Sequence, residues 1–453
     1  MTLRVLPGGA EVPAPGLLIR GASEVATLTG GLRTGSAQDD VAAIFGDSTA
    51  DPKGRHAPAV AAWEGRILAV GPLPEVMHRV RGLGLDEKRF SIIDARGGTV
   101  TPGLIDPHTH LLFAGTREGE MRLRQQGAGY LEVLAAGGGI LSTVEHTRAA
   151  SPDQLHAHGR RWLDEMLGHG VTTIEAKSGY GLDTITELRL LEVAGRLGQE
   201  GPIEIVPTFL GAHAVPPEYR GRRAGAEAYV ASVIEQQLPA VEAQSVARFC
   251  DVFCERGVFS VEQSRRVLEA GLRHGLAPRL HADELVPSGG AQLAAELGAV
   301  SADHLAAPSR EGIAALVDAA EAGRPVVATL LPATSLVLMK EHDAPARVLV
   351  DRGVPVALGS DFNPGTSPTP NLQLVLSLAV LRLKLTPSEA LAAVTVNAAH
   401  AVGLGETHGS LEEGRMADLV VWDAPSHELL PYWLGADLAR VVIKGGNVVL
   451  ARG

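Results

Sequence analysis

The sequence has only two cysteines among its 453 residues, Cys250 and Cys254. Two thiols cannot build a disulfide framework, so nothing in the sequence indicates an oxidising compartment. By themselves they also cannot complete a zinc site. We interpret both as reduced side chains on or near one strand.

Long apolar runs and an excess of positive charge are missing as well. No run reaches the roughly 18 apolar residues that a membrane-spanning helix needs, and the first residues hold no apolar stretch typical of a signal peptide. The formal net charge of −12 disfavours nucleic acid and anionic membranes as partners, because basic patches usually bind both. We expect a cytoplasmic protein whose site must contain a cation if its substrate is an anion.

The residues that are present suit a folded protein of some size. Hydrophobic residues make up 45% and charged residues 20% of the chain, a balance typical of globular rather than disordered proteins. The length suits one large enzyme barrel with a smaller module.

Short apolar or β-branched runs alternate with helical patterns through the middle of the chain, as buried parallel strands and their connecting helices do. Helical patterns cover 154–167, 186–197, 263–272 and 310–320. The alternation predicts an α/β fold, a (β/α)8 TIM-like barrel with its chemistry at the carboxyl ends of the strands. The eight expected strands are 103–107, 172–177, 204–210, 248–254, 278–282, 300–303, 326–331 and 355–359.

Both ends of the chain have a different pattern, with short strands around glycine turns. Neither end has room for a domain of its own, so we expect the two to pair into one small β-sandwich. The predicted domains are residues 1–101 and 403–453 for the sandwich and 102–402 for the barrel. Residues 33–56 are interpreted as an irregular insertion. The expected strands are 60–63, 67–70, 418–422, 441–443 and 448–450.

A His-x-His pair, His108 and His110, follows the first expected strand. Side chains two apart on a strand point the same way, so both imidazoles can face the barrel axis and form half of a divalent metal site. An isolated pair of this kind is more often two ordinary histidines. Its place at the mouth of a predicted barrel favours the metal site.

Three more candidate ligands stand at other strand ends. His281 closes the fifth expected strand, His304 follows the sixth, and Asp361 follows the eighth. One such position among 16 histidines would be unremarkable, but the coincidence at four strand ends predicts a metal centre.

This arrangement resembles the amidohydrolase superfamily, in which strand one supplies His-x-His, strands five and six supply His, and strand eight supplies Asp. The binuclear branch also has a carboxylated lysine on strand four, whereas strand four here ends at Glu255, and Lys177 lies on the second strand. The resemblance therefore implies one metal ion, zinc or iron. Its implied ligands are His108, His110, His281 and Asp361.

The chain resembles the imidazolonepropionase family more closely, from about residue 60 to its end. The segment Pro102-Gly-Leu-Ile-Asp-Pro-His-Thr-His110 and its continuation to residue 151 follow that family's pattern nearly throughout. The runs at 177–181, 210–213, 281–284 and 360–365 also look like family motifs. The resemblance implies hydrolysis of 4-imidazolone-5-propanoate to N-formimidoyl-L-glutamate in histidine degradation, and a homodimer.

The same resemblance implies roles for individual residues. Asp361 could accept the proton of the attacking water, His304 could orient that water, and Glu284 could pass a proton to the leaving ring nitrogen. Which of the three takes each proton stays open. Arg117 would bind the propionate through its guanidinium fork. The other implied substrate contacts are Tyr130, Tyr180, His213, Asn363, Gly365 and Thr366.

Two other functions stay open. A mononuclear deaminase of a purine, pyrimidine or related ring uses the same ligands and also a His-x-x-Glu, but an uncharged base offers Arg117 no carboxylate. A non-catalytic scaffold of the same fold is disfavoured, because all expected ligands and Glu284 are present. The run from Gly137 to Gly139 is either the hinge of a lid or a flexible turn.

Overall fold

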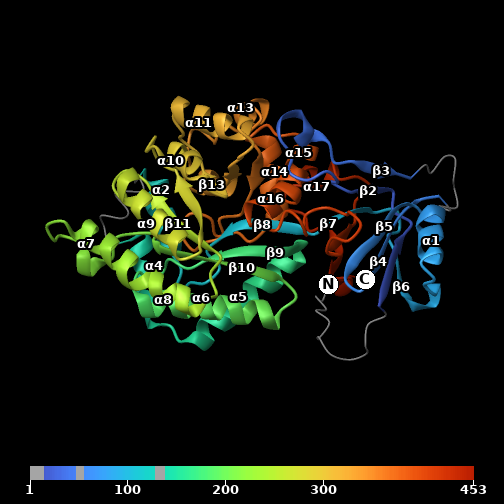
Figure 1. Ribbon diagram of the computed structural model, residues 1–453, viewed down its shortest axis with the longest axis horizontal. Coiled ribbons are helices and arrows are strands. Elements are labelled where there is room, and N and C mark those ends of the chain that lie inside the picture. Colours follow the sequence, from blue (N-terminus) through green and yellow to red (C-terminus); the bar gives the residue numbers. More distant parts are fainter. Residues whose placement is uncertain (1–14, 47–55, 128–137, 453) are drawn as a thin grey trace. The chain divides into compact units, whose positions relative to one another are not determined.

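The computed structural model describes residues 15–46, 56–127 and 138–452 (Figure 1). The chain divides into two compact units. The sandwich unit contains residues up to Ile105, Asp164–Thr173 and Asn371–Gly453, and the barrel unit contains Asp106–Leu163 and Ile174–Pro370. Residues 371–402 thus group with the ends of the chain, and the predicted domain bounds after residues 101 and 402 stay a prediction.

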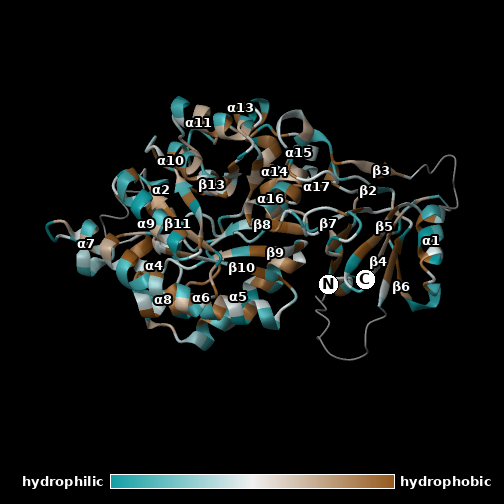
Figure 2. Ribbon diagram, viewed as in Figure 1, coloured by the Kyte–Doolittle hydropathy of each residue, from teal (hydrophilic) through white to brown (hydrophobic). Residues whose placement is uncertain are grey.

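Eight strands follow one another in chain order in a single sheet and form a nearly closed barrel, as predicted. Every expected strand has a counterpart, with small shifts of its ends. All residues of β8 and β9 are buried, and Figure 2 shows hydrophobic colours along parts of β9 and β10. The strands are β8 (Leu104–Thr109), β9 (Val171–Lys177), β10 (Glu204–Ala212), β11 (Phe249–Cys254), β12 (Ala277–Ala282), β13 (Ser301–His304), β14 (Val327–Leu330) and β15 (Val356–Leu358).

The barrel closes through backbone contacts between the end of β8 and the residues after β15. Thr109 forms a parallel bridge with Phe362. His110 N donates to the Phe362 carbonyl at 2.9 Å, and Asp361 N donates to the His108 carbonyl at 3.0 Å. The closure therefore places the His-x-His pair directly beside Asp361.

Helices connect the strands, and the four helices predicted from the sequence are α5, α6, α9 and α11. Helix α9 begins with a capping box of Ser260 and Gln263, which satisfies backbone N–H groups of its first turn. Among the described residues, the helices from β8 to β15 are α2 (Glu118–Gln125), α4 (Ile140–Ala149), α5 (Pro152–Gly168), α6 (Thr184–Glu200), η3 (Pro217–Tyr219), α7 (Gly225–Ser232), η4 (Val233–Gln237), α8 (Leu238–Gln244), α9 (Val261–Arg273), α10 (Gly290–Leu297), α11 (Arg310–Glu321), α12 (Pro332–Val337) and α13 (Ala346–Asp351).

In the sandwich unit, two sheets share one apolar core. Leu17 and Val60 from one sheet pack in the same cluster as Val100 and Leu419 from the other. One sheet has the order β5 (Arg66–Pro72), β4 (Pro58–Trp63), β1 (Gly16–Arg20) and β6 (Phe90–Asp94). The other has the order β18 (Asn447–Ala451), β17 (Ala439–Lys444), β16 (Leu419–Trp422), β7 (Thr99–Pro102), β2 (Glu24–Ala26) and β3 (Ala43–Phe45).

Both chain ends contribute to this sandwich, as predicted. Strand β16 pairs antiparallel with β7, so that Val420 lies opposite Thr101. The unit also holds η1 (Gly35–Asp39), α1 (Leu73–Gly82), η2 (Glu87–Arg89), α14 (Leu372–Leu381), α15 (Pro387–Ala393), α16 (Val396–Ala401) and α17 (Leu429–Tyr432).

The interpretation of residues 33–56 as irregular is wrong for its first part. Strand β3 pairs antiparallel with β2. The Asn397 side chain accepts a hydrogen bond from Arg33 N at 2.8 Å and donates one to the Arg33 carbonyl at 3.0 Å. These long-range bonds order a segment whose own sequence has too little hydrophobic alternation to predict a strand. Residues 47–55 lie outside the described part of the chain.

Two further expectations concern the cysteines and the membrane. Cys250 and Cys254 lie on the single strand β11, buried and as free thiols. Among the helices of the described residues, none combines the length and the apolar character needed to cross a membrane.

Candidate metal centre and active site

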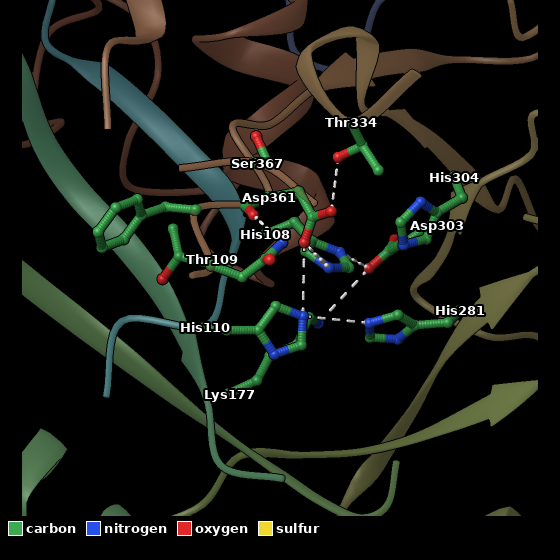
Figure 3. A network of polar contacts seen from close by, with 12 residues as sticks. His108, Thr109, His110, Lys177, His281, Asp303, His304, Thr334, Asp361 and Ser367 are labelled. Atoms are coloured by element: carbon green, nitrogen blue, oxygen red, sulfur yellow. Dashed lines mark hydrogen bonds and ion pairs between the residues drawn. The ribbon is translucent and has the colours of Figure 1, made fainter. Parts of the chain in front are cut away.

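The predicted ligands converge at the carboxyl ends of the barrel strands (Figure 3). His108 Nε2 and His110 Nε2 each lie 3.5 Å from Asp361 Oδ1. His281 Nε2 lies 3.4 Å from His110 Nε2. All four side chains are buried. Barrel closure, more than sequence proximity, brings them together, because they come from β8, β12 and the segment after β15.

These residues fit a metal ion. His108 Nε2 is buried and has no hydrogen-bond partner among the described residues, a costly state for an imidazole nitrogen unless a cation satisfies it. Burial also raises the pKa of Asp361 to about 7, so its carboxylate form needs a neighbouring positive charge. Three overlapping groups of possible ligands lie here: His108, His281 and His304; His110, His213 and His281; and His108, His110 and Asp361.

The carboxylate of Asp361 is held in place from its other side. Thr334 Oγ1 donates to Asp361 Oδ2 at 2.6 Å, which leaves Oδ1 directed at the histidines. The backbone of Asp361 has φ 53 and that of His304 has φ 73, a left-handed region that non-glycine residues rarely adopt. Such backbone strain is typical of functional sites, where the required direction of a side chain outweighs the energetic cost of the backbone conformation.

Carboxylates that sequence reasoning did not select hold the far nitrogens of two imidazoles. Asp303 Oδ2 lies 2.7 Å from His108 Nδ1, and Asp251 Oδ2 lies 3.0 Å from His281 Nδ1. A carboxylate in this place fixes the tautomer and leaves Nε2 as the lone-pair atom that a metal needs. Each of the two therefore orients one of the converging histidines.

Lys177 and Arg279 neutralise these carboxylates. Lys177 Nζ lies 2.8 Å from both Glu175 Oε1 and Asp251 Oδ2, and Arg279 donates to Asp303 at 3.0 Å. All five side chains are fully buried, and buried charges persist only when paired. The signal that could have revealed them is a charged residue inside an otherwise apolar buried strand, as Asp251 is in β11.

Glu284 and His304 line the same pocket as the predicted ligands His110, His281 and Asp361. Glu284 Oε2 lies 3.8 Å from His304 Nε2. Burial raises the pKa of Glu284, which favours a protonated carboxyl that can donate. The loop is fixed by the carboxylate of Asp283, which accepts hydrogen bonds from the backbone N–H groups of residues 288–291.

Most of the predicted substrate contacts line one pocket with these groups. His213 is stacked on the His110 ring at a centroid distance of 4.9 Å, and its Nδ1 lies 3.0 Å from the Gly179 carbonyl. Burial lowers the pKa of His213 to about 3, so its ring is neutral. The pocket is lined by His110, Arg117, Ile140, Tyr180, His213, Phe253, His281, Glu284, His304, Asp361, Asn363 and Thr366.

The segment after Asp361 shapes this pocket through its own hydrogen bonds. Asn363 Oδ1 accepts from Gly365 N at 2.8 Å and from Thr366 N at 2.7 Å. Gly365 lies against the Arg117 guanidinium. Tyr130 and Gly137 lie outside the described residues, whereas Gly139 precedes α4 as its N-cap residue, with φ 75.

Comparisons with known proteins identify the family of the chain and, separately, proteins that share its fold. Models described as "Amidohydrolase family" match residues 91–179 and 285–449. The imidazolonepropionase of Geobacillus thermodenitrificans is 51% identical over 86% of this chain and 89% of its own. That of Symbiobacterium thermophilum is 48% identical over 96% of this chain and 98% of its own. The chain belongs to the imidazolonepropionase family. The family inferred from the motifs is thereby confirmed.

Solved structures with lower identity support the fold of this imidazolonepropionase family member. Atrazine chlorohydrolase TrzN from Arthrobacter aurescens TC1 has a TM-score of 0.69 at 20% identity, covering 96% of this chain and 95% of its own. The 5-methylcytosine deaminase from Klebsiella pneumoniae has a TM-score of 0.68 at 16% identity, covering 96% and 98%. At these identities the likeness shows the barrel and sandwich architecture alone.

We predict that Asp303→Asn weakens metal binding. The amide cannot accept the His108 Nδ1 proton as a carboxylate does, so the imidazole loses its fixed tautomer, and affinity should fall by about 10- to 100-fold. Chelator competition on the purified protein measures this directly. Asp318→Asn, an exposed position on α11, is the matched control. Native affinity in Asp303→Asn would contradict the orienting role.

Proposed function

We propose that this chain is an imidazolonepropionase, which hydrolyses 4-imidazolone-5-propanoate to N-formimidoyl-L-glutamate in histidine degradation. Relatives with that name, near half identical over most of the chain, support the reaction. The observation that carries the proposal is one pocket that joins a histidine–aspartate cluster to the guanidinium of Arg117. The first suits hydrolysis of an amide, and the second suits the carboxylate of the substrate.

In this proposal a single zinc or iron ion is held by His108, His110, His281 and Asp361. Imidazole and carboxylate ligands suit both metals. When bound, such an ion supplies a Lewis acid and lowers the pKa of water toward neutrality. The orphaned His108 Nε2 and the absence of a lysine at the end of β11 support one ion with this ligand set.

The protein's own groups then move the protons. Asp361 Oδ1 accepts the proton of the attacking water, while Thr334 holds Oδ2 and keeps the carboxylate aimed. His304 orients the water or shares its proton. Glu284, whose raised pKa favours the acid form, donates to the leaving ring nitrogen.

Substrate recognition in this proposal uses other residues of the same pocket. Arg117 binds the propionate, and His213 and Tyr180 contact the ring. Asn363, Gly365 and Thr366 shape the pocket floor through the turn they form. Tyr130 is a further predicted contact that lies outside the described residues. A cytoplasmic location and a homodimer stay predictions.

A substrate panel tests the function against its nearest rival, deamination of a purine or pyrimidine. The purified protein should consume 4-imidazolone-5-propanoate, measured as loss of ring absorbance, and should release no ammonia from guanine or cytosine. Ammonia release without imidazolone turnover would overturn the substrate assignment. Purification without stoichiometric metal and without turnover would instead favour a non-catalytic scaffold.

Arg117→Ala should raise KM about 100-fold and leave the metal content unchanged, because it removes a buried cation that meets the substrate carboxylate. Steady-state kinetics and metal analysis measure the two quantities. Arg122→Ala, an exposed arginine on the same helix α2, is the control and should behave as wild type. Loss of metal in Arg117→Ala would show that the residue acts elsewhere.

Asp361→Asn should reduce kcat by about 100-fold or more, because the amide cannot accept the proton of the attacking water. Single-turnover measurements at saturating substrate test the step directly. Rates near those of wild type would contradict the assignment of Asp361 as the proton acceptor.

A further inference from the structure

The carboxylate of Glu120 lies buried beside the substrate-binding arginine. Glu120 belongs to α2 and is 7% exposed. It accepts two hydrogen bonds from Arg117, from Nε and from Nη2, each at 2.8 Å. It also accepts from Arg124 Nη2 at 2.9 Å and from Gly139 N at 2.6 Å. One carboxylate thus joins two guanidinium groups and the start of α4.

The helix explains why these three side chains meet. Arg117 is the N-cap residue that precedes α2, and the spacings of three residues to Glu120 and four more to Arg124 bring the three side chains together. Burial alone would raise the pKa of Glu120, but the hydrogen bonds and charges of Arg117 and Arg124 lower it overall. Glu120 is therefore an anion at neutral pH.

The charges of the group suit an anionic ligand. Two guanidinium groups and one carboxylate sum to one positive charge, and a substrate carboxylate would bring the sum to zero. This local excess of positive charge lies in a chain whose formal net charge is −12. Burial strengthens such local electrostatics relative to the distant surface charges, which solvent screens.

The bidentate pair of hydrogen bonds to Glu120 fixes the plane of the Arg117 guanidinium and occupies its Nε–Nη2 edge. Gly365 packs against the same guanidinium, because a Cβ there would lie 2.1 Å from Arg117 Cζ and 2.2 Å from Nη1. Arg124 Nη1 donates to the Gly365 carbonyl at 2.9 Å. Arg117 is thus clamped between Glu120 and the backbone of Gly365.

We propose that Glu120 is a positioning residue that sets Arg117 for the carboxylate of the substrate side chain and so gives the enzyme its preference for an anionic substrate. The inference rests on the proposed function, since it concerns the same pocket. A different role for Glu120 predicts the opposite effect. If Glu120 only competed with the substrate for Arg117, its removal would tighten substrate binding.

The experiment compares two substrates, 4-imidazolone-5-propanoate and its uncharged propanamide, on wild type, Glu120→Gln and Glu120→Asp. In Glu120→Gln the amide turns N–H donors toward guanidinium donors, so Arg117 loses its fixed plane. The KM for the propanoate should rise about 10- to 100-fold, with kcat and the KM for the propanamide changed by less than about 2-fold. Glu120→Asp keeps the charge but shortens the reach, and should also raise the KM for the propanoate.

Glu118→Gln is the matched control, because Glu118 is an exposed carboxylate on the same helix and should leave both KM values unchanged. An unchanged or lower KM for the propanoate in Glu120→Gln would overturn the proposal. An equal rise of KM for both substrates would also overturn it, since that pattern marks general damage to the pocket.

A second variant covers the case in which Glu120→Gln fails to fold. Gly365→Ala displaces Arg117 from its other face without altering α2, and should give the same selective rise of KM for the propanoate. Equal effects on both substrates would count against the clamp. Absence of propanoate turnover in the wild-type protein would overturn the proposed function itself. If the wild-type protein is active and Glu120→Gln leaves the KM for the propanoate unchanged, only the role of Glu120 is overturned.

Discussion

The burial of charge inside an apolar barrel is the constraint on which the rest of this structure depends. Buried imidazoles and carboxylates are costly unless their polar atoms have partners. Asp303 meets His108 Nδ1, Asp251 lies against His281 Nδ1, and Thr334 holds the outer oxygen of Asp361. Because these partners occupy the far atoms, the near atoms converge on one point. Lys177 and Arg279 then neutralise the supporting carboxylates, so a network of paired buried charges supports the site.

Closure of the barrel converts that network into a site. The backbone bonds between the end of β8 and the residues after β15 bring His108 and His110 to Asp361, although about 250 residues separate them in the chain. The left-handed backbone at Asp361 and His304 turns their side chains inward at the ends of short strands. The same segment continues into the Asn363 turn, which ends at Gly365 against the Arg117 guanidinium. Asp361 and the Gly365 contact with Arg117 thus lie on one short hydrogen-bonded segment.

The comparisons with known proteins distinguish the scaffold, which many proteins share, from the site. Structures of a chlorohydrolase and a deaminase share the fold at 16–20% identity, so the barrel itself does not select a substrate. The imidazolonepropionases share about half of the sequence over nearly the whole chain. In our proposal, Arg117 distinguishes a carboxylate-bearing substrate from a neutral base, and it lines the same pocket as His110, His281 and Asp361. Arg117 and Arg124 share the buried carboxylate of Glu120.

The sequence by itself determined the eight strands, the pairing of the two chain ends and the positions of the converging ligands. It could do so because buried parallel strands leave an apolar pattern, and because a barrel brings all its strand ends to one face. Only the tertiary structure decided which carboxylates support which histidines, that β3 extends the sandwich, and that Glu120 clamps Arg117. Those contacts depend on register between strands and on side-chain direction across elements distant in the chain. Hydrophobic periodicity carries no information about either, since it reports which side of an element is buried and not what that side meets.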